Sequence, residues 1–242
     1  MEVPETFHSS PLYNNVGVCM AMVIYYKMAI ELCCWARIRW QQSISRHVLH
    51  ICFYSLVVFW PYFDQRDWSW RLNALVPFVV WTRLIYKGAI LRDPNDPDVQ
   101  NISLSSSPHD LLFGPAWSAA IMFWIGLYAF MTEEAAVVAA IGLGDGLAPL
   151  IGAKYGRHIF QMALAKPKTV EGSVVGVFLG AVAGCYFYLY MMGIPLLPLR
   201  LVLAYAGIAA VAEATAPGHL DNVVAPLILH FSIERVQQIL PA

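Results

Sequence analysis

The chain is organised around the stretch Leu143-Gly-Asp145-Gly-Leu-Ala-Pro-Leu-Ile-Gly152-Ala-Lys154-Tyr-Gly156-Arg157. This stretch begins inside an apolar segment, 135–151, that is long enough to enter a lipid bilayer. Burying an ionised carboxylate in the centre of a membrane helix costs roughly 2.5–3.5 kcal/mol. Asp145 therefore marks a candidate functional site, because ionisable residues within membrane helices are costly and usually serve a function.

Composition places the whole chain in the membrane class. Of its 242 residues, 59% are apolar and 13% are charged, whereas a soluble domain carries about a quarter charged residues. Several long apolar runs then indicate a multi-pass membrane protein with membrane lipids around it. The net charge of −1 argues against a nucleic acid partner.

The expected architecture is an all-α, polytopic membrane bundle that forms a single domain over 1–242, with a short polar tail at 1–15. Hydrocarbon offers no partner for a free backbone amide, so the apolar runs must be helices. A last apolar stretch, 223–240, is an eighth membrane helix or an interfacial one. The seven expected membrane helices are 16–35, 47–63, 72–91, 111–131, 135–151, 173–192 and 197–213.

Lys and Arg are distributed unevenly between the loops that these helices define. Loops numbered alternately place three basic residues on one side, namely Arg66, Arg71 and Arg200. The other side receives nine: Arg37, Arg39, Arg46, Lys87, Arg92, Lys154, Arg157, Lys166 and Lys168. The positive-inside rule predicts that the second side is cytosolic, or the organellar equivalent.

The polar loop 154–172 carries the cations that a phosphate site needs. Lys154, Arg157, Lys166 and Lys168 can pair with a triphosphate, although cations also flank membrane helices for topological reasons alone. Asp145 can hold Mg²⁺, which usually takes only one or two protein carboxylates together with substrate phosphates. Glu171 is a second candidate for this role.

Two further polar clusters fall on the same side of the predicted membrane. Arg46 and His50 lie four residues apart on one helix face, where they anchor the helix at the interface or contact a phosphate. Glu213 precedes a Pro-Gly break, and Asp221 and Asn222 open the next helix. These last residues cap that helix or supply a further metal-binding or hydroxyl-orienting group.

Glycines are expected to serve packing in one helix and flexibility in another. Gly172, Gly176, Gly180 and Gly184 recur every four residues, which predicts a smooth stripe for close helix approach. Gly144, Gly146 and Pro149 surround Asp145 and predict a loosened backbone that could present amides and carbonyls to a ligand.

These clusters, in this order, resemble the polytopic lipid-alcohol kinases, a family that includes phytol, farnesol, dolichol and CTP-dependent diacylglycerol kinases. The resemblance covers about residues 46 to 230 and is strongest to the phytol and farnesol kinase branch. The motifs that carry it are Gly144-Asp145-Gly146, Gly152-Ala-Lys154-Tyr-Gly156 and Lys168-Thr-Val-Glu171-Gly172-Ser173.

Three looser matches extend the resemblance to both sides. They are Arg46-His47-x-x-His50, Asp110-Leu-Leu-Phe-Gly114-Pro115, and Glu213 followed by Asp221-Asn222-x-x-x-Pro226. The chain departs from the family pattern where His47 replaces Lys, and where Ser105, Ser106 and Ser107 stand in a region in which relatives carry an Arg.

The resemblance implies transfer of the γ-phosphoryl group of CTP, or of UTP, to the hydroxyl of a membrane isoprenoid alcohol such as phytol, farnesol, geranylgeraniol or a longer polyprenol. It implies Mg²⁺ as cofactor and an endoplasmic reticulum or plastid membrane as location. Such chemistry needs positioning, a metal ion and cationic clamps rather than a strong covalent nucleophile.

Roles follow for the individual residues. Asp145 and Asn222 are expected at the metal, and Glu213 and Asn222 are expected to orient the substrate. Glu171, Asp221 or Asp110 would orient or deprotonate the attacking hydroxyl. The nucleotide and its phosphates would be bound by Lys154, Arg157, Lys168, Arg46, His50, Gly144, Gly146, Gly172 and Ser173.

Alternative functions stay open from the sequence. A phosphatidate cytidylyltransferase also uses CTP and Mg²⁺ but releases pyrophosphate, and a diacylglycerol kinase differs only in its acceptor. A small ion-coupled transporter would use Asp145 and Glu213 as an intramembrane relay. The halves of the chain show no self-similarity of the kind that inverted-repeat transporters have.

Overall fold

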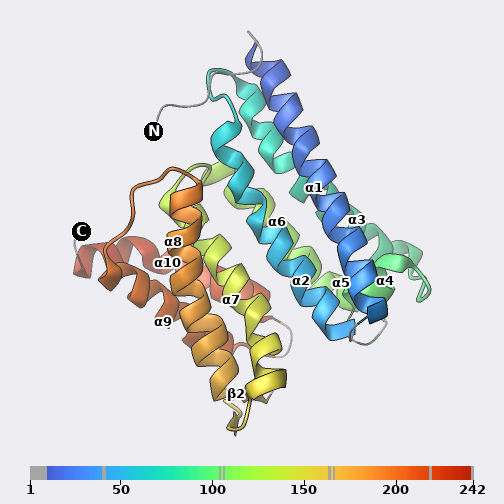
Figure 1. Cartoon of the computed structure of the whole chain (residues 1–242), viewed down its shortest axis with the longest axis vertical. Coiled ribbons are helices and arrows are strands. Elements are labelled where there is room, and N and C mark those ends of the chain that lie inside the picture. The colour runs from blue at the N-terminus through green and yellow to red at the C-terminus, as the bar shows by residue number, and fades with distance from the viewer. Residues whose placement is uncertain are drawn as a thin grey trace.

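A computed structural model describes residues 10–39, 42–103, 105, 107–162, 165, 167–217 and 220–240. Most of these residues lie in helices, and one short antiparallel pair of strands and several connecting loops make up the rest (Figure 1). The expectation of an all-α protein is confirmed.

The first half of the chain is a series of helical segments that pack on one another. α1 packs against α2, and α3 packs against α6. The segments, some of them 3₁₀ or π helices labelled η, are α1 (Pro11–Arg39), α2 (Gln42–Tyr54), η1 (Ser55–Tyr62), η2 (Trp68–Ala74), α3 (Leu75–Ile85), η3 (Tyr86–Leu91), α4 (Pro97–Ile102), α5 (Asp110–Phe113) and α6 (Pro115–Tyr128).

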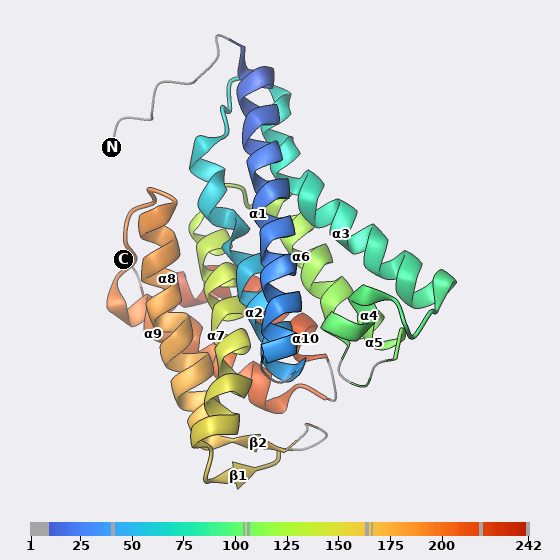
Figure 2. The same cartoon turned by 45° about the vertical axis from the view of Figure 1, so that its right-hand side comes forward.

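The second half is built around α7 (Glu133–Tyr155), which packs against α2, η4, α8 and α10 (Figure 2). Thr132 caps α7 by accepting a hydrogen bond from the Ala135 amide. Glu133 and Glu134 in the first turn stabilise the helix, because their negative charge interacts favourably with its dipole. The other segments are β1 (Ile159–Phe160), β2 (Lys168–Thr169), η4 (Gly172–Leu179), α8 (Gly180–Met191), α9 (Leu199–Thr215) and α10 (Asp221–Ile239).

Five helical stretches among the described residues are long and apolar enough to cross a membrane: Pro11–Arg39, Trp68–Leu91, Asp110–Tyr128, Glu133–Tyr155 and Gly172–Met191. They correspond to five of the seven expected membrane helices. The expected helices 47–63 and 197–213 are not among them. The helix in the latter region, α9, has 17 residues, which is at the lower end of what spans a bilayer.

The expected helix 47–63 changes character in its middle. α2 ends at Tyr54, and the chain continues as the 3₁₀ segment η1, which contains Pro61. The Ser55 hydroxyl donates to the Cys52 carbonyl at 2.8 Å, which competes with regular helix bonding. Pro61 has no amide hydrogen to donate, and η1 ends one residue later at Tyr62.

One face of α1 carries an exposed apolar stripe at intervals of three or four residues. Its members, all at least 43% exposed, are Val16, Met20, Ile24, Met28, Leu32 and Trp35. Lipid tails can cover such a stripe on a helix of 29 residues, so this face is consistent with a membrane protein.

The glycine stripe packs as expected. A Cβ atom added to Gly176 would fall on the backbone of Ala148, and one at Gly180 would lie 3.1 Å from the Cα atom of Gly144. Such close approach fits the use of small residues at membrane helix contacts. The loosening expected around Asp145 does not break the helix, because α7 runs without interruption through Asp145 and Pro149.

Candidate functional site

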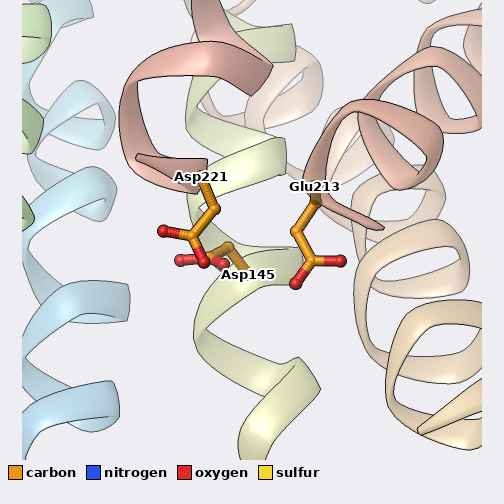
Figure 3. Close-up of side chains that lie close together, drawn as sticks. All are labelled: Asp145, Glu213 and Asp221. Atoms are coloured by element: carbon orange, nitrogen blue, oxygen red, sulfur yellow. The ribbon is translucent and has the colours of Figure 1, made fainter. Parts of the chain in front are cut away.

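Three acidic side chains from three different helices converge in the second half of the molecule. Asp145 lies in the middle of α7, Glu213 lies near the end of α9, and Asp221 is the first residue of α10 (Figure 3). One carboxylate oxygen from each lies within 4.8 Å of the other two. The packing of α10 on α9 brings Glu213 and Asp221 close together, and the packing of α10 on α7 adds Asp145.

Lys168 holds two of these three acids. Its ammonium group forms an ion pair with the Glu213 carboxylate, donates to the Glu213 carbonyl at 2.6 Å, and lies 3.6 Å from Asp221 Oδ2. The antiparallel pairing of Phe160 with Lys168 fixes the backbone at this position. The third acid, Asp145, has His50 Nε2 at 3.2 Å from its Oδ2.

The acids face a cavity of about 350 Å³. This polar cavity lies between α2, α7, the segment from β2 to η4, α9 and α10, and its volume suits a small ligand. Nine of the predicted site residues line it: Arg46, His50, Asp145, Lys168, Gly172, Ser173, Glu213, Asp221 and Asn222.

The cluster contains three acidic side chains and one basic side chain. Among the described residues, no Lys or Arg other than Lys168 forms an ion pair with these carboxylates. Burial, and after it the nearby carboxylate of Asp145, raises the pKa of Asp221. The raised pKa means that burial and the neighbouring acid disfavour the ionised form of Asp221, and a bound cation would favour it.

The donor set fits Mg²⁺. Carboxylate oxygens are the ligands that this ion prefers, and it usually keeps places for water and phosphate oxygens. Glu213 Oε2 is buried and has no hydrogen-bond partner among the described residues, although buried polar atoms normally have one. An ion held by Asp145 and Glu213 would satisfy this oxygen.

The remaining predicted residues do not line the cavity. Glu171 accepts hydrogen bonds from the backbone amides of Arg157 and His158 at 3.1 and 3.3 Å, and its other oxygen lies 2.7 Å from His158 Nδ1. The bond with His158 lowers the pKa of Glu171 to about 2. Glu171 therefore ties the loop after α7 to the start of η4.

Two of the predicted cations, Lys154 and Arg157, are exposed on the surface near the end of α7. The ammonium group of Lys154 lies 5.1 Å from the centre of the Tyr155 ring, and Arg157 is exposed. Lys166 lies outside the described residues. A role for these side chains in binding phosphate stays a prediction.

Asp110 serves the loop before α5. Its Oδ2 accepts hydrogen bonds from the Ser103 hydroxyl at 2.9 Å and from the amide and hydroxyl of Ser105, both at 2.8 Å. Its motif reaches the cavity through Gly114, where an added Cβ would lie 3.3 Å from Asn222 Nδ2 and 3.5 Å from the Arg46 guanidinium group.

Gly144 and Gly146 let neighbouring segments approach α7 on both sides of Asp145. A Cβ at Gly144 would lie 2.7 Å from the Val177 carbonyl oxygen, and one at Gly146 would lie 2.5 Å from the Ile51 side chain. The close approach brings η4 and α2 near Asp145, so these glycines shape the site through packing.

Two polar residues of the cavity wall were not among the predicted site residues. His47 lines the cavity but stands out in the sequence only as a departure from the family motif. Thr169 also lines it, and its hydroxyl accepts a hydrogen bond from the Gly172 amide at 3.1 Å. A Thr three residues before the first glycine of a helix is a recognisable capping signal.

A comparison with models of protein families gives no matching family for this chain, and a comparison with curated proteins gives no match. The choice of function therefore depends on the motifs and on the geometry of the cavity.

Proposed function

We propose that this chain is a membrane-embedded kinase that transfers the γ-phosphoryl group of CTP or UTP to the hydroxyl of an isoprenoid alcohol. The observation that carries the proposal is the convergence of Asp145, Glu213 and Asp221 with Lys168 at one cavity of a helical bundle. These residues are separated by up to 76 positions in the chain, so their convergence is a property of the fold.

The acids supply the metal site that such a transfer needs. Asp145 and Glu213 would hold Mg²⁺, which would neutralise phosphate charge, and Asp221 beside them would stay free to accept the proton of the hydroxyl. The buried, unpartnered Oε2 of Glu213 supports this assignment within the part of the chain that the structure describes.

Cationic and backbone groups of the chain would bind the triphosphate. Lys168 and Arg46 line the cavity and would neutralise phosphate oxygens. Gly172 and Ser173 lie at the beginning of the helix formed by η4 and α8, where amide groups and the helix dipole favour an anion. Lys168 would exchange part of its contact with Glu213 for a phosphate oxygen.

Phosphoryl transfer itself needs an oriented hydroxyl. The hydroxyl oxygen forms a bond to the γ-phosphorus while the bond from that phosphorus to its bridging oxygen breaks, so that CDP or UDP leaves. Of the three carboxylates considered for accepting the hydroxyl proton, Asp221 lines the cavity and Glu171 and Asp110 do not. We therefore assign the proton to Asp221, with Asn222 beside it to orient the acceptor.

The location proposed for the enzyme is an endoplasmic reticulum or plastid membrane with the basic loops on the cytosolic or stromal side. Five candidate membrane-spanning helices support a membrane location, and the excess of basic residues in alternate loops supports the orientation.

The decisive experiment compares CTP labelled at the α-phosphate with CTP labelled at the γ-phosphate, using purified protein in lipid nanodiscs with Mg²⁺ and a panel of prenols, diacylglycerol and phosphatidate. Transfer of the γ-label to a prenol with release of CDP is the expected result. Transfer of the α-label with release of pyrophosphate would instead identify a cytidylyltransferase, and preferential labelling of diacylglycerol would change the acceptor.

The matched variants are Asp145→Asn and Asp93→Asn. Asp145→Asn removes one metal-binding charge and should lower turnover at least about 100-fold while the protein stays folded. Asp93 is exposed in a turn, so Asp93→Asn should retain activity. Unchanged turnover in Asp145→Asn would remove this residue from the mechanism.

A further inference from the structure

A second, smaller cavity adjoins the polar cavity and shares part of its wall. It has a volume of about 50 Å³ and lies between α1, α2, α3, α4, α6 and the start of α10. Arg46, His50 and Asn222 line both cavities. The two spaces therefore meet at these three side chains.

Away from that junction the wall of the small cavity is mainly apolar. Leu49, Phe53, Val80, Leu84 and Ile102 line it, and each is at most 9% exposed. Tyr26 and Ser118 also line it, and the Ser118 hydroxyl already donates to the Gly114 carbonyl at 3.2 Å. Water gains few partners in such a space, whereas a hydrocarbon group would fill it.

The volume limits what can enter. A water-sized group needs roughly 10–15 Å³ by this measure, so the cavity has room for on the order of four such groups. That space suits the first few carbons of one chain. It does not suit two chains side by side or a nucleotide base.

We propose that this cavity, the acceptor pocket, receives the carbons next to the hydroxyl of a single-chain lipid alcohol. The hydroxyl then lies at the junction formed by Arg46, His50 and Asn222, facing the acidic cluster. This inference rests on the proposed kinase function, because it assigns the binding site of the acceptor.

Neighbouring valines of α3 offer a matched pair for testing the pocket. Val80 lines it and is 8% exposed, whereas Val79 is 51% exposed on the outer face of the same helix. Val80→Phe should fill the pocket and raise the KM for the alcohol at least about tenfold, with the KM for CTP unchanged. Val79→Phe should change neither constant.

Val80→Phe could fail to fold because it adds volume to a packed region, so Val80→Ala provides the opposite test. Its larger pocket should raise kcat/KM for an alcohol branched at the second carbon, relative to the straight-chain alcohol of equal length. Val79→Ala should leave this ratio unchanged.

A readout independent of catalysis completes the design. A straight-chain primary alcohol with a diazirine near its hydroxyl is irradiated with the protein in nanodiscs, without nucleotide, and labelled peptides are identified by mass spectrometry. We expect labels on α2, α3 or α6 that excess unlabelled alcohol prevents and that Val80→Phe removes.

The outcomes separate the two proposals. Labelling of the pocket without transfer from any nucleotide would overturn the kinase function and keep the pocket as a lipid-alcohol site. Transfer that is insensitive to both Val80 variants, with labels elsewhere, would overturn the pocket and keep the kinase function. Absence of both labelling and transfer would overturn both.

Discussion

At the scale of single residues, Lys168 holds the acidic cluster together. Its side chain is 15% exposed and its partner Glu213 is 8% exposed, so the pair is largely removed from water. Deleting one partner of a buried ion pair is costly, because the other charge stays buried without compensation.

Lys168→Met should therefore lower the free energy of unfolding by about 3 kcal/mol and the Tm by roughly 6–12 °C. Thermal unfolding in detergent without added divalent cation measures the change. Lys154→Met, at an exposed position near the end of α7, should alter stability by no more than about 0.5 kcal/mol. Equal Tm values for the two variants would show that Lys168 does not stabilise the cluster.

The contact between Glu171 and His158 gives a prediction on pH. Because the folded protein lowers the pKa of Glu171 from 4.5 to about 2, the ionised carboxylate stabilises the loop fully above pH 4.5. This contribution declines as the pH falls from about 4.5 towards 2. His158→Ala removes the largest cause of the shift and should raise the pKa of Glu171 towards 4.5. A ¹³C carboxyl NMR titration, with Glu171→Gln for assignment, measures it, and an unchanged pKa would contradict the assigned cause.

At the scale of elements, the contact between α7 and the helix formed by η4 and α8 depends on glycine. A side chain at Gly176 would meet the backbone of Ala148, which cannot move aside as a flexible side chain can. A Cβ atom added to Gly207 in α9 would have no described atom of another part of the chain within 4 Å. Both glycines lie in helices, but only Gly176 lies against the backbone of a neighbouring helix.

Alanine at these two positions should have opposite effects. Gly176→Ala should destabilise the protein by about 1–3 kcal/mol through overpacking, whereas Gly207→Ala should stabilise it by up to about 1 kcal/mol through helix propensity. Unfolding measured for both variants in the same detergent checks the signs. A stabilising Gly176→Ala would mean that the two helices are not in close contact there.

The elements also show where sequence patterns stop being sufficient. The four-residue spacing of the glycines identified the face on which α8 and η4 meet α7, because that face follows from the helix period alone. The division of the expected helix 47–63 into α2 and η1 did not follow. At this division the Ser55 hydroxyl donates to the Cys52 carbonyl, and Pro61 lies within η1. A hydropathy pattern contains no information on such local contacts.

At the scale of the whole molecule, the sidedness of the loops is open to direct test. In a variant with its five cysteines replaced by alanine, single cysteines are introduced at Arg92, Arg157 or Arg200. We expect the first two positions on the basic side and the third, in the first turn of α9, on the opposite side. A membrane-impermeant maleimide applied to sealed vesicles should label the first two from one side and the third from the other. Labelling of Arg92→Cys and Arg157→Cys from opposite sides would refute the expected orientation.

The helical architecture and five candidate membrane-spanning helices could be predicted from the order of the amino acids. These properties follow from composition and from the length of apolar runs, since a bilayer leaves the backbone no alternative to internal hydrogen bonding. The sequence also offered the polar residues from which a site could be made, including Asp145, Lys168, Glu213 and Asp221.

Which of those residues share a cavity could be seen only in the folded molecule. Lys168 reaches Glu213 across 45 positions of the chain, and Asp221 reaches Asp145 through the packing of α10 on α7. Glu171, an equally plausible acid in the sequence, turns instead to backbone amides fourteen and thirteen residues before it. The rotation of each helix about its axis, and the contacts between helices, set the direction of each side chain, and both depend on the whole packed bundle rather than on local sequence.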